Sequence, residues 1–128
     1  KRETTVLLSP KFGNTTSEFD GYSWDNLNNL PNQNNRPVMK PNDMRVFLGD
    51  VIFDSQRGVV VAHGFGGTWE YDGVDWLKIE TAQGPNSQWH SMVYDESRGI
   101  TVLFGGIDED GKPIEGTWLY DGQAWVQD

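Results

Sequence analysis

Short runs of apolar and β-branched residues, separated by polar turns, dominate the hydrophobic pattern of the chain. The runs 59–62 and 100–104 are nearly continuous apolar stretches, as expected for strands that are buried on both faces. Each run follows a polar turn that closes with Arg57-Gly58 or Arg98-Gly99, a pattern typical of a β-hairpin. The pattern therefore predicts an all-β chain of short strands without long helices.

A motif of an aromatic residue followed by Asp-Gly-x-x-Trp occurs three times along the chain. The copies begin at Phe19, Tyr71 and Tyr120 and end at Trp24, Trp76 and Trp125. Their first residues lie 71 − 19 = 52 and 120 − 71 = 49 residues apart. A nearly constant spacing of this length indicates an internal structural repeat.

Each repeat predicts four short strands, which we label a to d in chain order. In the last unit, strands are expected at 89–94, 99–104, 116–120 and 123–127, and in the middle unit at 47–53, 58–63, 67–71 and 75–79. The first unit offers Val6-Leu7-Leu8 as strand b and the turn at Phe19 between strands c and d, but no strand a precedes them. The chain thus predicts about eleven strands in three units, the first of them incomplete.

The last unit resembles the kelch repeat of β-propellers, in the superfamily of the galactose oxidase central domain. The matching residues are Tyr94-Asp95, Arg98-Gly99, Gly105-Gly106, Trp118, Tyr120 and Trp125. The middle unit keeps Arg57-Gly58, Trp69, Tyr71 and Trp76 but has Gly64-Phe65 where the family has Gly-Gly. In the first unit Ser17 replaces the tryptophan of strand c.

The resemblance implies about three four-stranded antiparallel propeller blades, the first lacking strand a. The expected blades cover about 1–27, 46–80 and 86–128, with a linker at about 28–45. The six aromatic residues of strands c and d in the last two units are expected to form the core between blades. Three blades are too few to close a ring, so the chain, which begins at Lys1, is expected to be a fragment of a longer propeller or to assemble. A two-fold homodimer would supply about six blades.

Composition narrows the range of partners. The 128 residues carry a formal net charge of −9 with no cluster of Lys or Arg, which argues against nucleic acid. No apolar run is long enough to insert in a membrane. The absence of cysteine excludes disulfides, thiolate catalysis and the cysteine–tyrosine crosslink of the related copper oxidases. The compartment stays open, with a secreted or cell-surface protein slightly favoured.

In propellers of this family the loops between strands d and a, and between strands b and c, gather on one face. The d–a loops are expected at about 28–46 and 80–88, and the b–c loops at about 9–15, 64–66 and 105–115. Loops on a rigid scaffold are the usual carriers of ligand-binding residues. A ligand is therefore expected on this face.

The segment 86–90 offers amides that could bond a ligand and an indole that could stack on one, although Trp89 and His90 could equally pack between blades. Arg36 and Arg45 could bind a carboxylate. The candidate ligand-binding residues are Arg36, Arg45, Phe65, Asn86, Gln88, Trp89 and His90.

Other acidic and histidine residues favour structural roles. Asp108-Glu109-Asp110-Gly111 lacks the ligand spacing of a calcium loop and is typical of a turn. Asp20, Asp72 and Asp121 each precede glycine and are also interpreted as turn residues. His63 is expected at the end of a strand, with a structural role. No cofactor, metal site or catalytic motif is predicted.

Three functions agree with these observations. The first is a non-catalytic propeller scaffold that binds a protein or glycan ligand through the loop face. The second is a fragment or subunit of a propeller enzyme acting on carbohydrate, because a catalytic carboxylate pair forms only in space. The third is a purely structural assembly unit.

Overall fold

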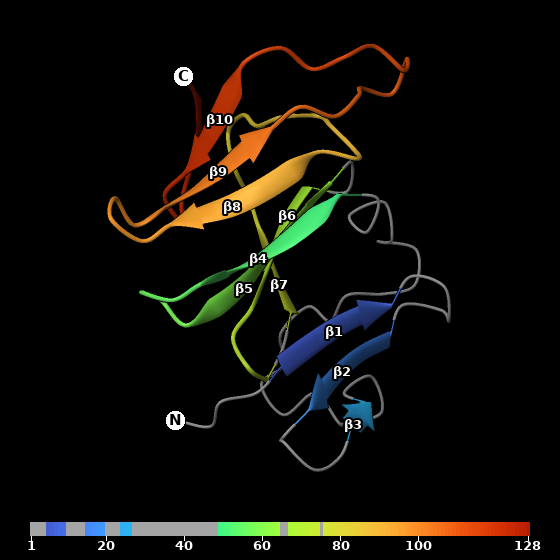
Figure 1. Ribbon diagram of the computed structural model, residues 1–128, viewed down its shortest axis with the longest axis vertical. Helices are drawn as coiled ribbons and strands as arrows, with labels where there is room; N and C mark the ends of the chain where they lie inside the picture. Colours follow the sequence, from blue (N-terminus) through green and yellow to red (C-terminus); the bar gives the residue numbers. More distant parts are fainter. Residues whose placement is uncertain (1–4, 10–14, 20–23, 27–48, 65–66, 75) are drawn as a thin grey trace.

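The computed structural model describes residues 5–9, 15–19, 24–26, 49–64, 67–74 and 76–128, and every regular element in these ranges is a β-strand. The strands form three antiparallel sheets in which sequence neighbours pair (Figure 1). The first sheet contains β1 (Thr5–Ser9), β2 (Thr15–Phe19) and β3 (Trp24–Asn26). The second contains β4 (Asp50–Asp54), β5 (Val59–Gly64), β6 (Gly67–Tyr71) and β7 (Trp76–Ile79). The third contains β8 (Ser91–Asp95), β9 (Ile100–Phe104), β10 (Thr117–Tyr120) and β11 (Trp125–Gln127).

The hairpin turns form because an aspartate side chain bonds the backbone that follows it. Asp54 accepts bonds from the backbone N–H groups of Gln56 and Arg57 at 3.1 and 2.9 Å. Asp95 makes the equivalent bonds in the third sheet. Gly58 and Gly99 close the two turns at φ values of 69° and 67°, a backbone conformation that glycine adopts without steric cost. The Arg-Gly pattern of the sequence is thus explained by local turn chemistry.

The all-β prediction and the order of strands within each unit are confirmed in the described ranges. The third sheet departs from the prediction by two residues at the starts of two strands, because β8 begins at Ser91 and not at residue 89, and β11 begins at Trp125 and not at residue 123. Trp89 has a φ of 55°, which lies outside the strand region and ends any extended run there. That the sheets are blades of a propeller stays a prediction.

The core lies on both sides of the second sheet, which stands between the other two (Figure 1). One cluster contains Ala62, Trp69, Tyr71 and Trp76. The other joins the second and third sheets and contains Val61, Met92, Leu103, Tyr120 and Trp125. Five of the six predicted core aromatics are therefore buried, whereas Trp118 is half-buried.

The packing of the two complete sheets has a direction. We call the face that carries Tyr71 and Trp76, or Tyr120 and Trp125, the front of a sheet, and the opposite face its back. Val61 lies on the back of the second sheet and packs against the front of the third. The third sheet therefore sits front to back on the second.

Candidate functional site

Two loops meet at one end of the third sheet. The connection between β7 and β8 contributes Gln88, and the connection between β9 and β10 contributes Ile107. Their backbones exchange two hydrogen bonds, each 3.0 Å long. Ile107 also bridges to Pro113 in its own loop. A d–a loop and a b–c loop are thus joined into one surface at this end.

Trp89 stands out from this surface. Its side chain is 67% exposed, while Ser87 and His90 on either side of it are buried. Its φ of 55° places it in the left-handed region, which is unfavourable for a residue with a large side chain. Strained backbone persists only where the surroundings hold it, and it is concentrated at functional sites.

His90 lies beneath Trp89 and ties the loop to the second sheet. Its Nε2 accepts a 3.2 Å bond from the backbone N–H of Asp50, so the ring proton must be on Nδ1. Nδ1 then donates to the hydroxyl of Ser87 at 2.9 Å. Burial lowers the pKa of His90, although the negative charge of Asp50 opposes the shift. The ring is therefore neutral and links the loop to the second sheet through these two hydrogen bonds. We call a buried histidine that links two elements in this way a bracket.

His63 forms a second bracket, and its ring centroid is 5.6 Å from that of His90. Its Nε2 lies 2.7 Å from the Pro85 carbonyl, which can only accept, so Nε2 donates. Its Nδ1 accepts from the Thr68 hydroxyl at 2.9 Å, and that oxygen accepts a 2.8 Å bond from the indole N–H of Trp125. Burial is the main cause that lowers the pKa of His63 to about 4; the bond to Pro85 opposes this shift, and the neighbouring His90 contributes to it.

These bonds show what the predicted site residues do. Asn86 and Trp89 are exposed and available to a ligand, Gln88 is half-buried, and His90 faces inward. The sequence also allowed Trp89 and His90 to pack between sheets. Only His90 is buried in this way. The other candidates lie outside the described residues; they are Arg36, Arg45 and Phe65.

The acidic loop in the third sheet is a turn. One carboxylate oxygen of Asp108 accepts bonds from the backbone N–H groups of Asp110 and Lys112 at 2.9 and 2.8 Å. Asp121 does the same for Gln123 and Ala124 at 2.8 and 2.9 Å. These bonds agree with the turn interpretation of both aspartates. Within the described residues, no group of three or more His, Asp or Glu side chains could hold a metal ion.

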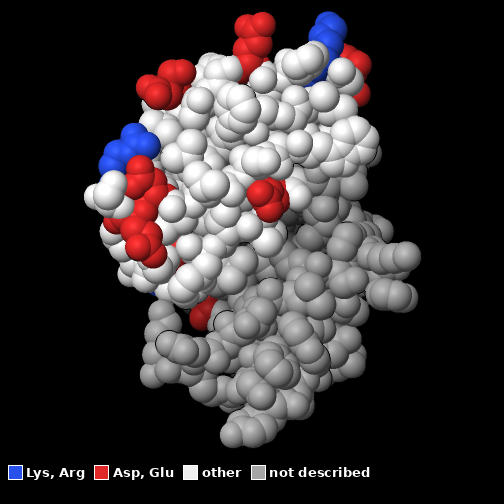
Figure 2. All heavy atoms as spheres, in the orientation of Figure 1, with Lys and Arg blue, Asp and Glu red and all other residues white. Residues whose placement is uncertain are grey.

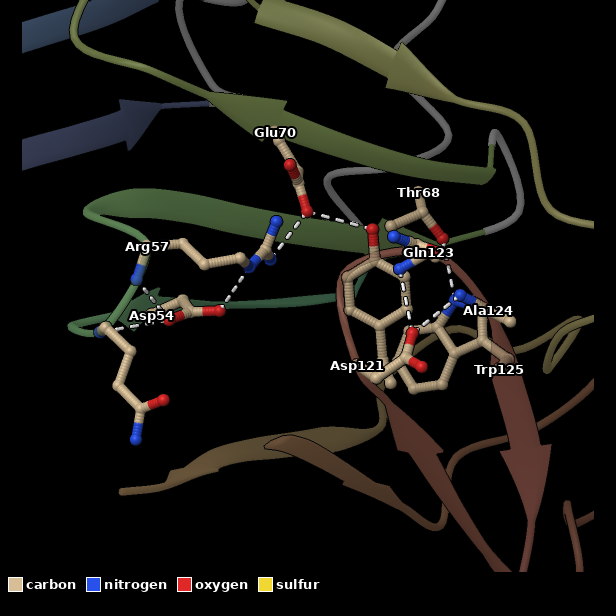
Figure 3. Close-up of polar contacts among 10 residues, drawn as sticks. Asp54, Arg57, Thr68, Glu70, Asp121, Gln123, Ala124 and Trp125 are labelled. Atoms are coloured by element: carbon tan, nitrogen blue, oxygen red, sulfur yellow. Dashed lines mark hydrogen bonds and ion pairs between the residues drawn. The ribbon is translucent and has the colours of Figure 1, made fainter. Parts of the chain in front are cut away.

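A charged cluster between the sheets was not anticipated from the sequence. Arg57 points toward Asp54 and Glu70 (Figure 3), and each ion pair measures 2.7 Å. Glu70 also accepts a 2.8 Å bond from the hydroxyl of Tyr120, over whose ring Arg57 lies at 5.8 Å from the centroid. Burial, and then the charge of Glu70, raise the pKa of Tyr120. The sequence signal that could have indicated this cluster was Glu70, a charged residue inside a predicted strand.

Charged side chains are sparse over much of the visible surface. On the face shown in Figure 2, most of the described part is uncharged, and acidic and basic side chains lie chiefly near its edges. That face has no basic stripe of the kind that binds phosphate groups. In the described part of the chain no helix is long and apolar enough to cross a membrane.

Comparison with known proteins adds no relative. The chain matches no protein-family model and no curated protein sequence.

Proposed function

We propose that this chain is a kelch-like β-propeller scaffold that binds a glycan or protein ligand, without catalysis, through the joined loops around Trp89. The repeated sheets and their front-to-back packing support the propeller part of the proposal. Both are what stacked blades require.

The observation that supports this binding site is the exposure and backbone conformation of Trp89. Its large apolar ring is exposed at 67% while its backbone is held at a φ of 55°. The buried brackets of Ser87 and His90 fix the backbone on both sides, so little ordering is left for a ligand to impose. Preorganised aromatic rings bind well because few rotatable bonds are immobilised on contact.

The chemistry of this surface suits an uncharged ligand. An indole face packs against the C–H face of a sugar ring, or against a proline or aromatic side chain. Asn86, three residues before Trp89 and also exposed, adds an amide that can both donate and accept. Tryptophan is enriched among the residues that dominate binding energy at interfaces.

The test is a screen of labelled protein against immobilised oligosaccharides and against a phage-displayed random-peptide library. Any hit is titrated by calorimetry with the wild type, Trp89→Ala and the control Val74→Ala. Val74 is also an exposed apolar residue but lies in the turn between β6 and β7. Trp89→Ala should weaken binding by about 30-fold or more, since a central aromatic contributes about 2 kcal/mol or more.

The control variant should bind like the wild type. A hit that Trp89→Ala does not weaken would overturn the site. No hit in either collection would overturn the binding function and favour a structural unit.

A further inference from the structure

The back of the third sheet is an apolar surface that nothing in the described chain covers. Val93, Val102, Leu119 and Val126 are paired in register across its four strands. Val93 and Val126 are 60% and 56% exposed, and Phe104 on the same face is 66% exposed. A continuous apolar face of this kind marks an interaction site.

The equivalent face of the second sheet shows what covers such a surface. Its register row is Ile52, Val61, Glu70 and Leu77. Val61 is fully buried because the front of the third sheet packs on it. The back of the third sheet is therefore suited to pack against the front of another sheet.

We propose that the back of the third sheet docks the front of the first sheet of a second copy of this chain, where the front of the first sheet is the face on which the register pair Phe19 and Trp24 lies. Two copies joined head to tail in this way close on each other as a dimer with about six sheets. The contact is separate from the Trp89 loops, so the proposal goes beyond ligand binding and does not depend on it.

The first argument for a second copy comes from a residue pair in the contact between the second and third sheets. In the contact between the second and third sheets, Glu70 on the back accepts a 2.8 Å bond from the hydroxyl of Tyr120 on the front. At the position of Glu70, the third sheet has Leu119. A tyrosine docked there would bury its hydroxyl against Leu119 without a partner, which is costly.

Phe19 removes this mismatch. It pairs in register with Trp24, as Tyr120 pairs with Trp125, so it holds the tyrosine position of the first sheet. Of the three motif copies, only the first has phenylalanine there. Glu18 holds the position of Glu70 in the first sheet, since it pairs with Val6 and Asp25. The third sheet is thus the one described sheet whose back lacks this glutamate, and the first is the one whose front lacks the hydroxyl, which favours the first sheet as the occupant.

The second argument is a hydrogen bond that the docked sheet can repeat. Trp125 on the front of the third sheet donates to Thr68 on the back of the second. Thr117 holds the position of Thr68 in the third sheet, since it pairs with Phe104 as Thr68 pairs with His63. Trp24 of a second copy is thus offered the same acceptor.

The third argument is an arginine at the edge of the open face. Arg57 bonds Asp54 and covers the ring of Tyr120 on the next sheet. Arg98 makes the same 2.7 Å bond to Asp95, but its side chain is 57% exposed, against 33% for Arg57. Docking would place an aromatic ring beside Arg98, where a cation–π contact adds to binding.

Light scattering coupled to size-exclusion chromatography, over a wide range of protein concentrations, measures the association. The wild type should be a dimer. Leu119→Glu should raise the dimer dissociation constant by at least about 100-fold, because it buries a carboxylate against Phe19, which has no hydroxyl to donate to it. Val74→Glu adds the same charge to an exposed apolar residue outside the face and should remain a dimer. Circular dichroism verifies that each variant is folded.

A compensating change separates the proposed contact from a general loss of stability. Phe19→Tyr combined with Leu119→Glu recreates the Tyr120–Glu70 pair and should restore the dimer. Phe19→Tyr alone should weaken the dimer even if Leu119→Glu does not fold. The proposal would be overturned by a monomeric wild type, by an open polymer, or by a dimer that neither variant weakens. The back of the third sheet would then be covered by a further sheet or by another protein.

Discussion

At the scale of single residues, Gly49 is a position that tolerates no side chain. A Cβ atom there would overlap the carbonyl oxygen of His63 and lie 2.6 Å from Cε1 of His90. Neither the His63 backbone nor the His90 ring can move away, because both residues are held by buried hydrogen bonds between the second and third sheets.

Gly49→Ala should therefore lower the free energy of unfolding by about 2 to 3 kcal/mol, as overpacking does in a dense core. Urea denaturation measures this. Gly73→Ala is the control, since Gly73 has no atom within 4 Å of its Cβ position and a φ of 95°, so that only backbone strain of about 1 kcal/mol applies. Equal losses for the two variants would contradict the account of Gly49.

Trp89 gives a second prediction at this scale, which separates stability from function. Trp89→Gly removes the ring and also the strain of a side chain at φ 55°, whereas Trp89→Ala removes the ring alone. The glycine variant should be as stable as the alanine variant or more stable, by up to about 1 kcal/mol. Both should lose ligand binding. Thermal unfolding compares them, and a glycine variant clearly less stable than alanine would show that the backbone there is not strained.

At the scale of elements, the second and third sheets are joined through a chain of hydrogen bonds centred on β6. Thr68 accepts from the indole of Trp125 and donates to His63. Thr68→Val keeps the shape but leaves both partners buried without a bond, so the free energy of unfolding should fall by about 2 to 4 kcal/mol.

Thr101 is the matched control for this prediction. It is equally buried, but its hydroxyl has no hydrogen-bond partner. Thr101→Val should therefore be neutral or stabilising. Chemical denaturation of the two variants beside the wild type decides the point, and a Thr68→Val protein as stable as Thr101→Val would show that the bond chain adds nothing.

At the scale of the whole molecule, the two histidine brackets make the association of the sheets sensitive to acid. The pKa of His63 is about 4 in the folded protein and about 6.5 when unfolded. Between these values the unfolded chain binds more protons, so stability is complete above about pH 6.5 and is lost as the pH falls toward 4.

The free energy of unfolding should drop by about 2 to 3 kcal/mol between pH 7.5 and 4.5 from His63, with a further loss from His90, whose pKa is also lowered despite Asp50. Denaturation curves at both pH values measure the change. The aspartates with lowered pKa values, Asp54, Asp95 and Asp121, act only below about pH 4. His63→Asn should be less stable at pH 7.5 and should show a smaller drop, and an unchanged drop would contradict the assignment to His63.

Much of the local structure follows from the sequence alone. The turns are determined there because an aspartate such as Asp54 or Asp121 bonds backbone groups two or three residues away. The strands follow from apolar runs between these turns, and burial of Trp76 and Trp125 follows from the repeated motif. Such interactions are short-range, so they are visible in the order of residues.

The candidate site shows what only the tertiary structure decided. The sequence singled out Trp89 and His90 together, but packing separates them into an exposed ring and a buried bracket. The bond from Trp125 to Thr68 spans 57 residues and the bond from Tyr120 to Glu70 spans 50. Contacts this distant arise when one sheet packs on another, and their geometry depends on the register and orientation of whole sheets, which no local pattern encodes.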